Sequence, residues 1–532
     1  MSYQPLANLL ISWLLLPFAA AFLAALLPGL SRWVALLSAT STLLVGAWAW
    51  QGGSLSLDLI GDLGVLLRVD GLAAPFLVLN ALVVLAVLLE RWRQPPEGPF
   101  AVLLPVLLGG LNSAVLAIDL VSLYVALEVV GITAFLLILR NRDTGQLWIA
   151  LRYLLVGSSV MTFYLVGVAM LYVHAGSFRL TALADLPATD PALSVILALV
   201  LLGLLTKGGL FLSGLWLPRT HAEAPADVSA LLSGMVVGGG LCPLLRLADQ
   251  LPFLQPLLLF LGLASALLGL VYPLLESDLK RLLAWSTLSQ VGLVLLHPPI
   301  GGLVALTHGL AKASLFLVAG RVPSRLLDGW SSRPLPAGLA LPLLLSSLSL
   351  SGAPLLLGFW SKQSLFGAPI AALNALPGLA NVWVPTLLSV GTAAVYARLW
   401  WFPLASGFGG APSPGALILA ALLWLAALLP LPLPAGAAGP SALGALQMAG
   451  PNTLGKAMAV LAAGAGVEAL RFSAGHLLRR SPMVGGPGRW RLPDLERLSD
   501  LLGSMALMGT ALLVLLGLRP APLQLVGMPW LG

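Results

Sequence analysis

The sequence predicts an all-α polytopic membrane protein, and two observations support this prediction. Hydrophobic residues make up 59% of the 532 residues and charged residues only 9%, against about 25% charged residues in an ordinary soluble domain. Apolar runs of about 20 residues, the length that a helix needs to cross a bilayer, recur along the chain. A soluble protein could not cover so much apolar surface, so we expect a lipid bilayer around the chain.

Hydropathy and loop signals place the expected membrane spans in order along the chain. We expect fourteen spans, at 6–28, 32–50, 72–90, 99–118, 120–139, 151–174, 193–216, 228–247, 254–274, 281–297, 301–320, 337–360, 383–402 and 414–434, and two weaker ones at 453–470 and 501–518. The first 30 residues lack the basic segment of a cleavable signal, so we expect the first run to be a retained helix. Gly208-Gly209 and the pair Pro354/Gly358 predict breaks inside two of the spans.

The basic residues predict the orientation of these spans. The loops after odd-numbered spans hold Arg32, Arg91, Arg93, Arg140, Arg142, Arg152, Arg219, Lys280, Arg281, Arg321, Arg325 and Arg333, and the alternate loops hold Arg68, Arg179 and Arg246. Basic residues favour the cytoplasmic side of a membrane. We therefore expect the N-terminus outside, with the arginine-rich segment 471–497 also cytoplasmic.

Lysine is rare, and three of the five lysines lie deep inside apolar segments. They are Lys207, Lys312 and Lys362. A charge inside the bilayer costs several kcal/mol, so an intramembrane ionisable residue indicates a functional site. A desolvated lysine can exchange a proton, whereas arginine stays charged almost anywhere. The pattern predicts proton chemistry, with a structural lysine that reaches the membrane interface as the alternative.

Three further ionisable groups qualify as candidates. Glu128 lies in the middle of the expected span 120–139 and could take or release a proton as its partner changes, or form a static ion pair. His308 precedes Lys312 by one helical turn, which places both on one helix face and suits a proton relay. His221 and Glu223 lie where a broken helix meets a loop and could gate or hydrate a path.

Several other functions lack support in the sequence. The single Cys242 excludes a disulfide framework and a CxxC redox pair, and five scattered histidines do not supply a metal, haem or iron–sulfur site. Residues 450–457 approximate a phosphate-binding loop, but Ala457 replaces the required hydroxyl. The net charge of +7 is spread over the loops and forms no stripe for nucleic acid. We expect neither a cofactor nor a nucleic-acid partner.

Five segments of the chain carry a family resemblance. They are DLVSLYVALEVVGITAFLL, KGGLFLSGLWLPRTHAEAPADVSALLSG, ESDLKRLLAWSTLSQVGL, THGLAKASLFLVAG and SGAPLLLGFWSKQSL. In this order they resemble the antiporter-like, proton-translocating subunits of complex I, of Mrp-type cation/proton antiporters and of membrane-bound hydrogenases. The resemblance covers about residues 100–400 and is specific for the superfamily.

The resemblance implies an architecture. It implies a 14-helix antiporter-like core with two inverted five-helix repeats and broken helices, to which this chain adds about two C-terminal helices. The corresponding parts are N-terminal helices in 1–98, a first repeat in 99–250, a second repeat in 251–403, and C-terminal helices with a cytoplasmic linker in 404–532.

It also implies roles for the buried charges. Glu128 and Lys207 would form an ion pair, His308 and Lys312 would carry protons onward, and Lys362 would be the charge on the exit side. The implied partners are other membrane subunits of a multisubunit complex, with protons and Na⁺ or K⁺ as transported ions. The implied location is the bacterial plasma membrane or the thylakoid membrane.

Two positions depart from the family pattern. Gly238 stands where members commonly carry a lysine, between Lys207 and Lys312, and Arg219 replaces the usual aspartate. Three functions therefore stay open. They are a proton-conducting subunit of a complex I-like quinone oxidoreductase or a cation/proton antiporter, a structural or assembly subunit with a degenerate proton path, and a stand-alone secondary transporter.

Overall fold

The computed structural model describes most of the chain. The described residues are 4–61, 64–95, 98–141, 144–187, 190–327, 330, 334–367, 380–402, 412–428, 450–480, 495 and 497–517. Three expected segments lie mostly outside the described residues. They are the loops 403–413 and 431–452 and the part 481–497 of the arginine-rich segment.

Helices form nearly all of the described structure. In chain order they are α1 (Gln4–Leu26), α2 (Ser31–Trp50), α3 (Ala74–Glu90), α4 (Gly98–Leu116), α5 (Leu120–Ile138), α6 (Thr144–Ala175), α7 (Ala182–Asp185), α8 (Pro191–Gly208), α9 (Leu217–Glu223), α10 (Ala226–Leu231), α11 (Gly238–Gln250), α12 (Gln255–Leu275), α13 (Leu279–Val294), α14 (Pro298–Ala319), α15 (Ala337–Ser351), α16 (Leu357–Gly367), α17 (Ala380–Ala397), α18 (Pro414–Leu428), α20 (Pro451–Arg480) and α21 (Leu498–Gly517). Within the described residues, eleven helical segments are long and apolar enough to cross a membrane.

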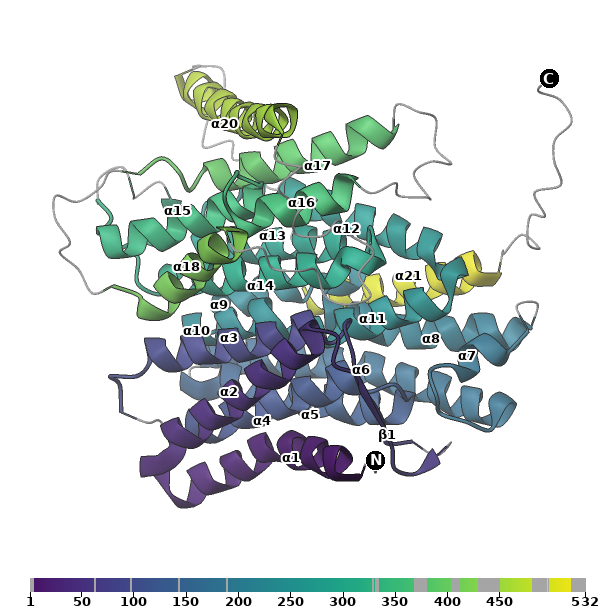
Figure 1. Cartoon of the computed structure of the whole chain (residues 1–532). Helices are drawn as coiled ribbons and strands as arrows, with labels where there is room; N and C mark the ends of the chain where they lie inside the picture. The colour runs from purple at the N-terminus through teal and green to yellow at the C-terminus, as the bar shows by residue number, and fades with distance from the viewer. Residues whose placement is uncertain are drawn as a thin grey trace, which may run out of the picture.

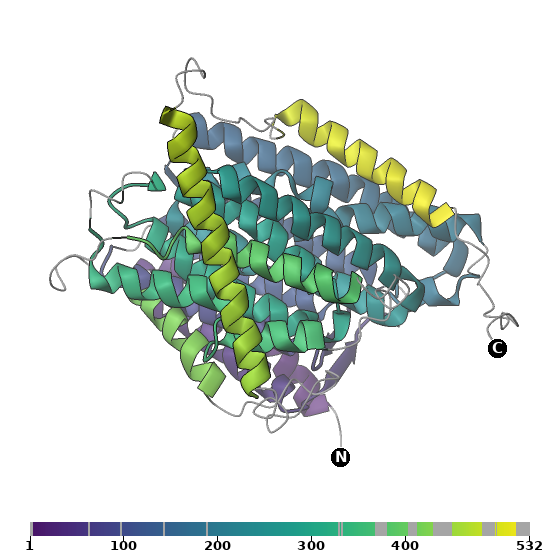
Figure 2. The ribbon, with the colours of Figure 1, turned by 90° about the horizontal axis from the view of Figure 1, so that it is seen from above.

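Most of these helices run side by side in one body, as Figure 1 shows. The helix α14 and the segment Ala226–Gln250 are buried almost throughout and form its centre. The N-terminal α1 and α2 lie on one side of the body, and α21 lies along another edge (Figures 1 and 2).

The helix α20 departs from this common direction. We expected a membrane span at 453–470, and α20 is long and apolar enough for one. Figure 2 shows it crossing the outside of the body, against α17. The helix also continues to Arg480, well into the segment that the sequence assigned to a cytoplasmic linker.

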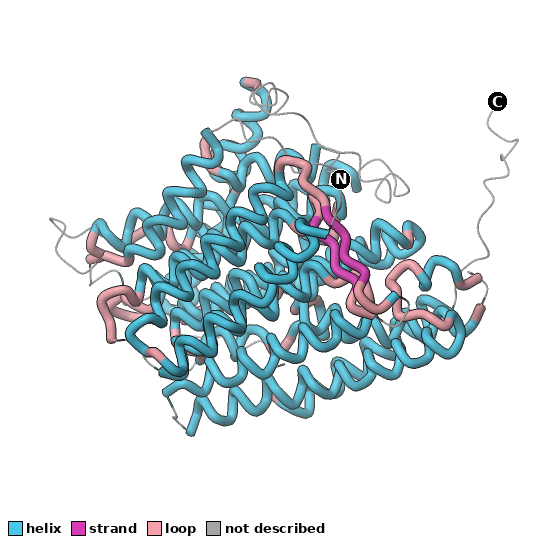
Figure 3. The backbone as a smooth tube through the Cα atoms, turned by 60° about the horizontal axis from the view of Figure 1, so that its bottom comes forward, coloured by secondary structure: helices cyan, strands magenta, loops and turns pink. Residues whose placement is uncertain are grey.

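A short β-hairpin interrupts the all-α pattern. The strands β1 (Leu55–Asp58) and β2 (Leu66–Val69) pair antiparallel at one end of the helical body (Figure 3). Asp119 connects this hairpin to α5, because its carboxylate accepts hydrogen bonds from the backbone N–H groups of Leu66 (2.8 Å) and Ser122 (2.7 Å). The second of these bonds caps the N-terminus of α5.

Two arginines that we expected in loops lie inside helices instead. Arg152 is part of α6, which begins seven residues before the expected span 151–174, and its side chain is buried. Arg246 is part of α11 and forms a two-pronged ion pair with Asp70, with N–O distances of 2.6 and 3.1 Å. Neither residue therefore marks a loop.

The break in each of the two interrupted spans comes at a glycine in the left-handed region. The helix α8 ends at Gly209, with φ of 70°, and α15 ends at Gly352, with φ of 84°. Each break is followed by a short helix, α9 and α16 respectively. The first break lies where the sequence predicts it, whereas the second comes two residues before Pro354.

Candidate functional site

The first buried lysine lies in the last turn of the broken helix α8. Asp190 caps the start of this helix by accepting a hydrogen bond from Ala192 N at 2.8 Å, and Pro191 occupies its first position. The left-handed Gly209 ends the helix, and the N–H groups of Gly209 and Leu210 donate to the carbonyls of Thr206 and Leu205. The C-terminal end of a helix favours a nearby cation, and Lys207 lies in the last turn of α8.

Lys207 forms an ion pair with Glu128 from α5. The Lys207 Nζ lies 3.2 Å from a carboxylate oxygen of Glu128 and donates a second hydrogen bond to the carbonyl of Leu127 at 3.3 Å. The side chains are 10% and 21% exposed, respectively. The structure therefore brings together the two residues that the resemblance pairs.

A cavity adjoins this ion pair. Tyr153, Ser158 and Trp216 line it together with Glu128 and Lys207, and it offers about 20 Å³ for the centres of water molecules. That space suffices for about one water. Small residues keep it open, since a Cβ atom at Gly131 would lie only 2.9 Å from the Lys207 Nζ. Water can therefore contact the charged pair.

The second buried lysine has neutral partners. The Lys312 Nζ donates to the carbonyl of Leu283 and to the Ser286 hydroxyl, both at 2.5 Å, and lies 5.5 Å from the centre of the Tyr396 ring. The Tyr396 hydroxyl in turn donates to Ser286 at 3.2 Å. None of these groups is a carboxylate, so the site does not hold the lysine permanently in its charged form through an ion pair.

His308 and Lys362 meet at a second cavity. Both line it with Gln290, Ser349 and Ser361, and it offers about 10 Å³ for water centres. Both ring nitrogens of His308, the Lys362 Nζ and the Gln290 Nε2 are buried, and none of them makes a hydrogen bond within the described part of the chain. Buried polar atoms without protein partners commonly bind water. The cavity therefore suits a water that connects the two side chains.

The break after α15 positions Lys362. The left-handed Gly352 leaves room for the lysine stem, because a Cβ atom there would lie 2.9 Å from Cδ of Lys362. A residue with positive φ also follows each break, Phe211 at 47° and Leu355 at 66°. The same local arrangement thus occurs in both halves of the chain: a broken helix with a buried lysine beside the break.

His221 and Glu223 have different environments, although both lie on α9. His221 is fully buried, whereas Glu223 is exposed. The two residues that the sequence grouped as a possible gate therefore differ in their exposure to solvent.

Four polar residues of the site were not predicted from the sequence. They are Tyr153, Ser286, Gln290 and Tyr396. Ser286 and Gln290 are four residues apart in an apolar helix, so they lie on one face of α13. This spacing is the sequence signal from which both residues could have been predicted.

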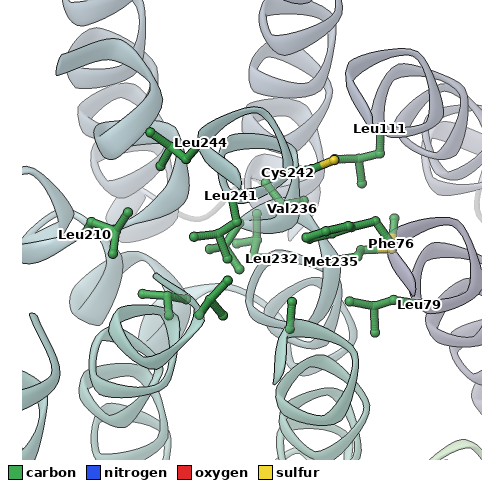
Figure 4. Close-up of a cluster of buried hydrophobic side chains, with 14 of the residues drawn as sticks. Phe76, Leu79, Leu111, Leu210, Leu232, Met235, Val236, Leu241, Cys242 and Leu244 are labelled. Carbon is green, nitrogen blue, oxygen red and sulfur yellow. The ribbon is translucent and has the colours of Figure 1, made fainter. Parts of the chain in front are cut away.

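The position of the absent lysine, Gly238, faces an apolar side chain. A Cβ atom there would lie 3.2 Å from Cδ1 of Phe76 on α3. Figure 4 shows the apolar cluster around this segment of the chain, which includes Phe76, Leu79, Leu111, Leu210, Leu232, Met235, Val236, Leu241, Cys242 and Leu244. Phe76 thus occupies space next to the position where a lysine would project.

Broken helices, buried lysines and an ion pair inside an apolar body define a multi-pass integral membrane protein with a charged interior. Residues 117–389, just over half of the chain, match the family model described as NADH:quinone oxidoreductase/Mrp antiporter, TM. The chain belongs to this family.

Individual relatives agree with this assignment. The chain is 31% identical over 386 residues to the NADH-quinone oxidoreductase subunit N of Desulforudis audaxviator, covering 66% of this chain and 75% of that protein. It is 32% identical over 408 residues to the A/B subunit of a probable K⁺/H⁺ antiporter from Rhizobium meliloti, covering 68% of this chain and 40% of that protein. A chain of the Mrp complex from Dietzia sp. DQ12-45-1b superposes with a TM-score of 0.71 and 26% identity over 98% of this chain and 64% of its own.

Proposed function

We propose that this chain is a proton-conducting membrane subunit of a multisubunit complex, either a complex I-like quinone oxidoreductase or a cation/proton antiporter. The observation that carries the proposal is the 3.2 Å ion pair between Lys207 and Glu128 at the end of a broken helix. Burial of an ion pair inside an apolar body costs free energy, so its presence here favours a functional role.

Protons would move along the buried charges in the order that the fold presents them. Lys207 exchanges a proton with water in its cavity when Glu128 moves away or returns, because the nearby carboxylate favours the charged lysine. Lys312 and His308 carry the proton onward, and the water-sized cavity beside His308 leads to Lys362. Lys362 then releases it.

A neighbouring subunit would drive the switch at Glu128. The same helix, α5, exposes Val125, Ile132 and Leu136 on its surface, which makes this face available to lipid or to another membrane subunit. Movement of a partner against α5 would change the distance between Glu128 and Lys207. The named relatives are subunits of NADH-quinone oxidoreductases and antiporters, which supports partners of that kind.

In the proposed orientation the N-terminus lies outside the cell. The end of the helical body that holds Arg91 and Arg140 faces the cytoplasm. Both guanidinium groups pair with Asp227 at 2.7 Å, and Arg325 pairs with Asp278 at 3.0 Å at the same end. The bacterial plasma membrane or the thylakoid membrane is the proposed location.

The similar breaks after α8 and α15 support the proposed two repeats, 99–250 and 251–403.

Removal of the Lys207 ammonium group tests this function. The complex with Lys207→Ala, reconstituted in vesicles, should lose proton uptake by about 100-fold, whereas Lys456→Ala, at an exposed position of α20, should leave uptake unchanged. Unchanged uptake in Lys207→Ala would show that Lys207 carries no protons.

The same preparations separate the other two functions. A structural subunit would leave uptake intact in Lys207→Ala and in Lys362→Ala, while deletion of the chain would prevent assembly. A stand-alone transporter would move its solute as a purified single chain in vesicles.

A further inference from the structure

A cavity outside the proposed proton path lies where the helices α2, α3 and α4 meet. In Figure 1, α2 lies beside α3 and α4 at the surface of the helical body. The cavity opens between the start of α2, the end of α3 and the start of α4, and it offers about 40 Å³ for water centres, twice the space beside Lys207. That space holds about three water molecules. A group larger than one water therefore fits between these three helix ends.

Two arginines supply the charge of this cavity. Arg32, in the first turn of α2, donates a hydrogen bond to the carbonyl of Gln94, and Arg91 directly follows α3. Arg91 pairs with Asp227, but the same carboxylate oxygen also accepts from Arg140, and both distances are 2.7 Å. No carboxylate of the described residues pairs with Arg32. The three arginines and the one aspartate therefore leave two positive charges at this corner.

The start of α4 adds donors of a second kind. Phe100 and Ala101 line the cavity from the first turn of this helix, which is 19 residues long. The first N–H groups of a helix have no partner within it, and together with the helix dipole they favour a phosphate oxygen. Arginine side chains bind phosphate through charge-assisted hydrogen bonds. Two arginines and a helix start thus converge on one cavity, an arrangement that suits a phosphate group.

Two tryptophans beside the cavity indicate the level of the lipid headgroups. Trp33 and Trp92 pack edge to face with ring centres 5.5 Å apart, and the guanidinium carbon of Arg32 lies 5.9 Å from the centre of the Trp92 ring. Tryptophan is enriched at the interface between bilayer and water. In the proposed orientation this end of the body faces the cytoplasm, where anionic lipids attract basic segments.

An apolar face of α2 leads from the cavity toward the middle of the bilayer. Trp33, Leu37 and Leu44 are exposed, and their spacing of four and seven residues places them on one side of the helix. A phospholipid has a phosphate at one end and hydrocarbon chains at the other, so it matches the cavity and this face together. A membrane helix of another subunit would match the apolar face alone.

We propose that this corner binds one anionic phospholipid, with its phosphate between Arg32 and Arg91 and its acyl chains along Trp33, Leu37 and Leu44. This inference goes beyond the proposed function and does not depend on it. The guanidinium of Arg32 has five N–H donors, of which the described residues engage one, so donors remain for the phosphate. A zwitterionic lipid would bring its own ammonium group close to the arginines, so the net positive charge favours an anionic headgroup.

Cross-linking with photoactivatable lipids in vesicles that hold the whole complex tests the site. The two probes are phosphatidylglycerol and phosphatidylcholine with the same photoactivatable acyl chains. The readout is the lipid cross-linked to residues 30–48 as a fraction of all lipid cross-linked to the chain. We expect this fraction to be about tenfold higher with phosphatidylglycerol. Equal fractions would overturn the inference. Cross-links elsewhere on the chain but none at 30–48 would also overturn it, because another subunit would then cover this face.

Two variants separate charge from space. Arg32→Gln removes the charge, and Ala101→Leu fills the cavity without a change in charge. Each should lower the phosphatidylglycerol fraction about tenfold. Arg68→Gln is the matched control, because Arg68 on β2 also lacks a carboxylate partner among the described residues and bonds to Ser56 at 3.4 Å. Wild-type fractions in either Arg32→Gln or Ala101→Leu would contradict the proposed site.

A large excess of inorganic phosphate distinguishes a lipid headgroup from free phosphate. We expect the excess to leave the phosphatidylglycerol fraction unchanged, because the acyl chains add apolar contacts that phosphate lacks. Loss of the lipid from residues 30–48 under these conditions would show a site for free phosphate and would overturn the lipid assignment. Proton uptake by the same vesicles reports the proposed function separately, so either conclusion can fail alone.

Discussion

At the residue scale, the buried lysines differ in the partners that hold them. Lys207 faces a carboxylate, Lys312 faces a carbonyl and a hydroxyl, and Lys362 faces a cavity. A carboxylate stabilises the charged form of lysine, whereas neutral acceptors and water permit either form. This series makes Lys207 the residue whose charge depends most on the movement of another side chain.

The hydroxyl of Ser286 should affect the charge on Lys312. Ser286→Ala removes one of the two hydrogen-bond acceptors of a buried amine, which costs about 1–3 kcal/mol for the charged form. We expect proton uptake to fall by about tenfold while the amount of assembled complex stays unchanged. Ser473→Ala, at an exposed position of α20, is the control. Unaltered uptake in Ser286→Ala would show that this contact does not influence proton transfer.

The sequence identified the charged residues of the site but not their polar partners. A charge in an apolar segment costs free energy and therefore indicates a function or an ion partner, so Glu128, Lys207 and Lys312 could be recognised from the sequence alone. Serine, glutamine and tyrosine are tolerated in membrane helices through bonds to their own backbone. The roles of Ser286 and Gln290 therefore depended on the tertiary structure.

At the element scale, the broken helices create the site. The end of α8 at Gly209 leaves Lys207 in the last helical turn, and the end of α15 at Gly352 makes room for the stem of Lys362. The positive φ values favour glycine at both positions. The sequence predicted both breaks because these spans contain Gly and Pro, but hydropathy does not show which glycine ends each helix.

Replacement of Gly209 should be costly for two reasons. Gly209→Ala places a side chain in the left-handed region and brings its Cβ to 2.6 Å from Cδ1 of Leu217. We expect a loss of about 2–3 kcal/mol and a lower midpoint of thermal unfolding in detergent.

The matched control for that variant is Gly176→Ala. Gly176 has φ of 66°, but no atom lies within 4 Å of the position that an added Cβ would take, so it reports the backbone strain alone. A shift in the unfolding midpoint no larger for Gly209→Ala than for Gly176→Ala would show that the packing against α9 contributes nothing.

At the scale of the whole molecule, two helices at the end of the chain lie outside the central body in different ways. The helix α21 packs along α8, and α20 crosses α17 (Figure 2). The fold class followed from composition and hydropathy alone. The β-hairpin and the direction of α20 did not, because both depend on contacts between segments far apart in the sequence.

One ion pair joins α20 to the residue that follows α17. The Glu468 carboxylate forms two hydrogen bonds with Arg471, each 2.6 Å long, and lies 3.7 Å from the Arg398 Nε at the end of α17. Glu468→Ala should weaken this attachment by about 1–3 kcal/mol, because it leaves a nearly buried guanidinium without its carboxylate. Limited proteolysis in detergent should then cleave the flanks of α20 faster, while Lys456→Ala on the same helix should not change the rate. Equal cleavage in both variants would contradict a role for Glu468 in attachment.

The central claim is that Glu128 and Lys207 act as one unit in proton transfer. The most direct measurement is the initial rate of proton uptake into vesicles that hold the complex with Glu128→Gln, Lys207→Ala or both changes. Residues that act as a unit give strongly non-additive effects. We expect each single variant to lose most of the uptake and the double variant to lose no more than Lys207→Ala alone. Losses that multiply in the double variant, or normal uptake in either single variant, would contradict this account.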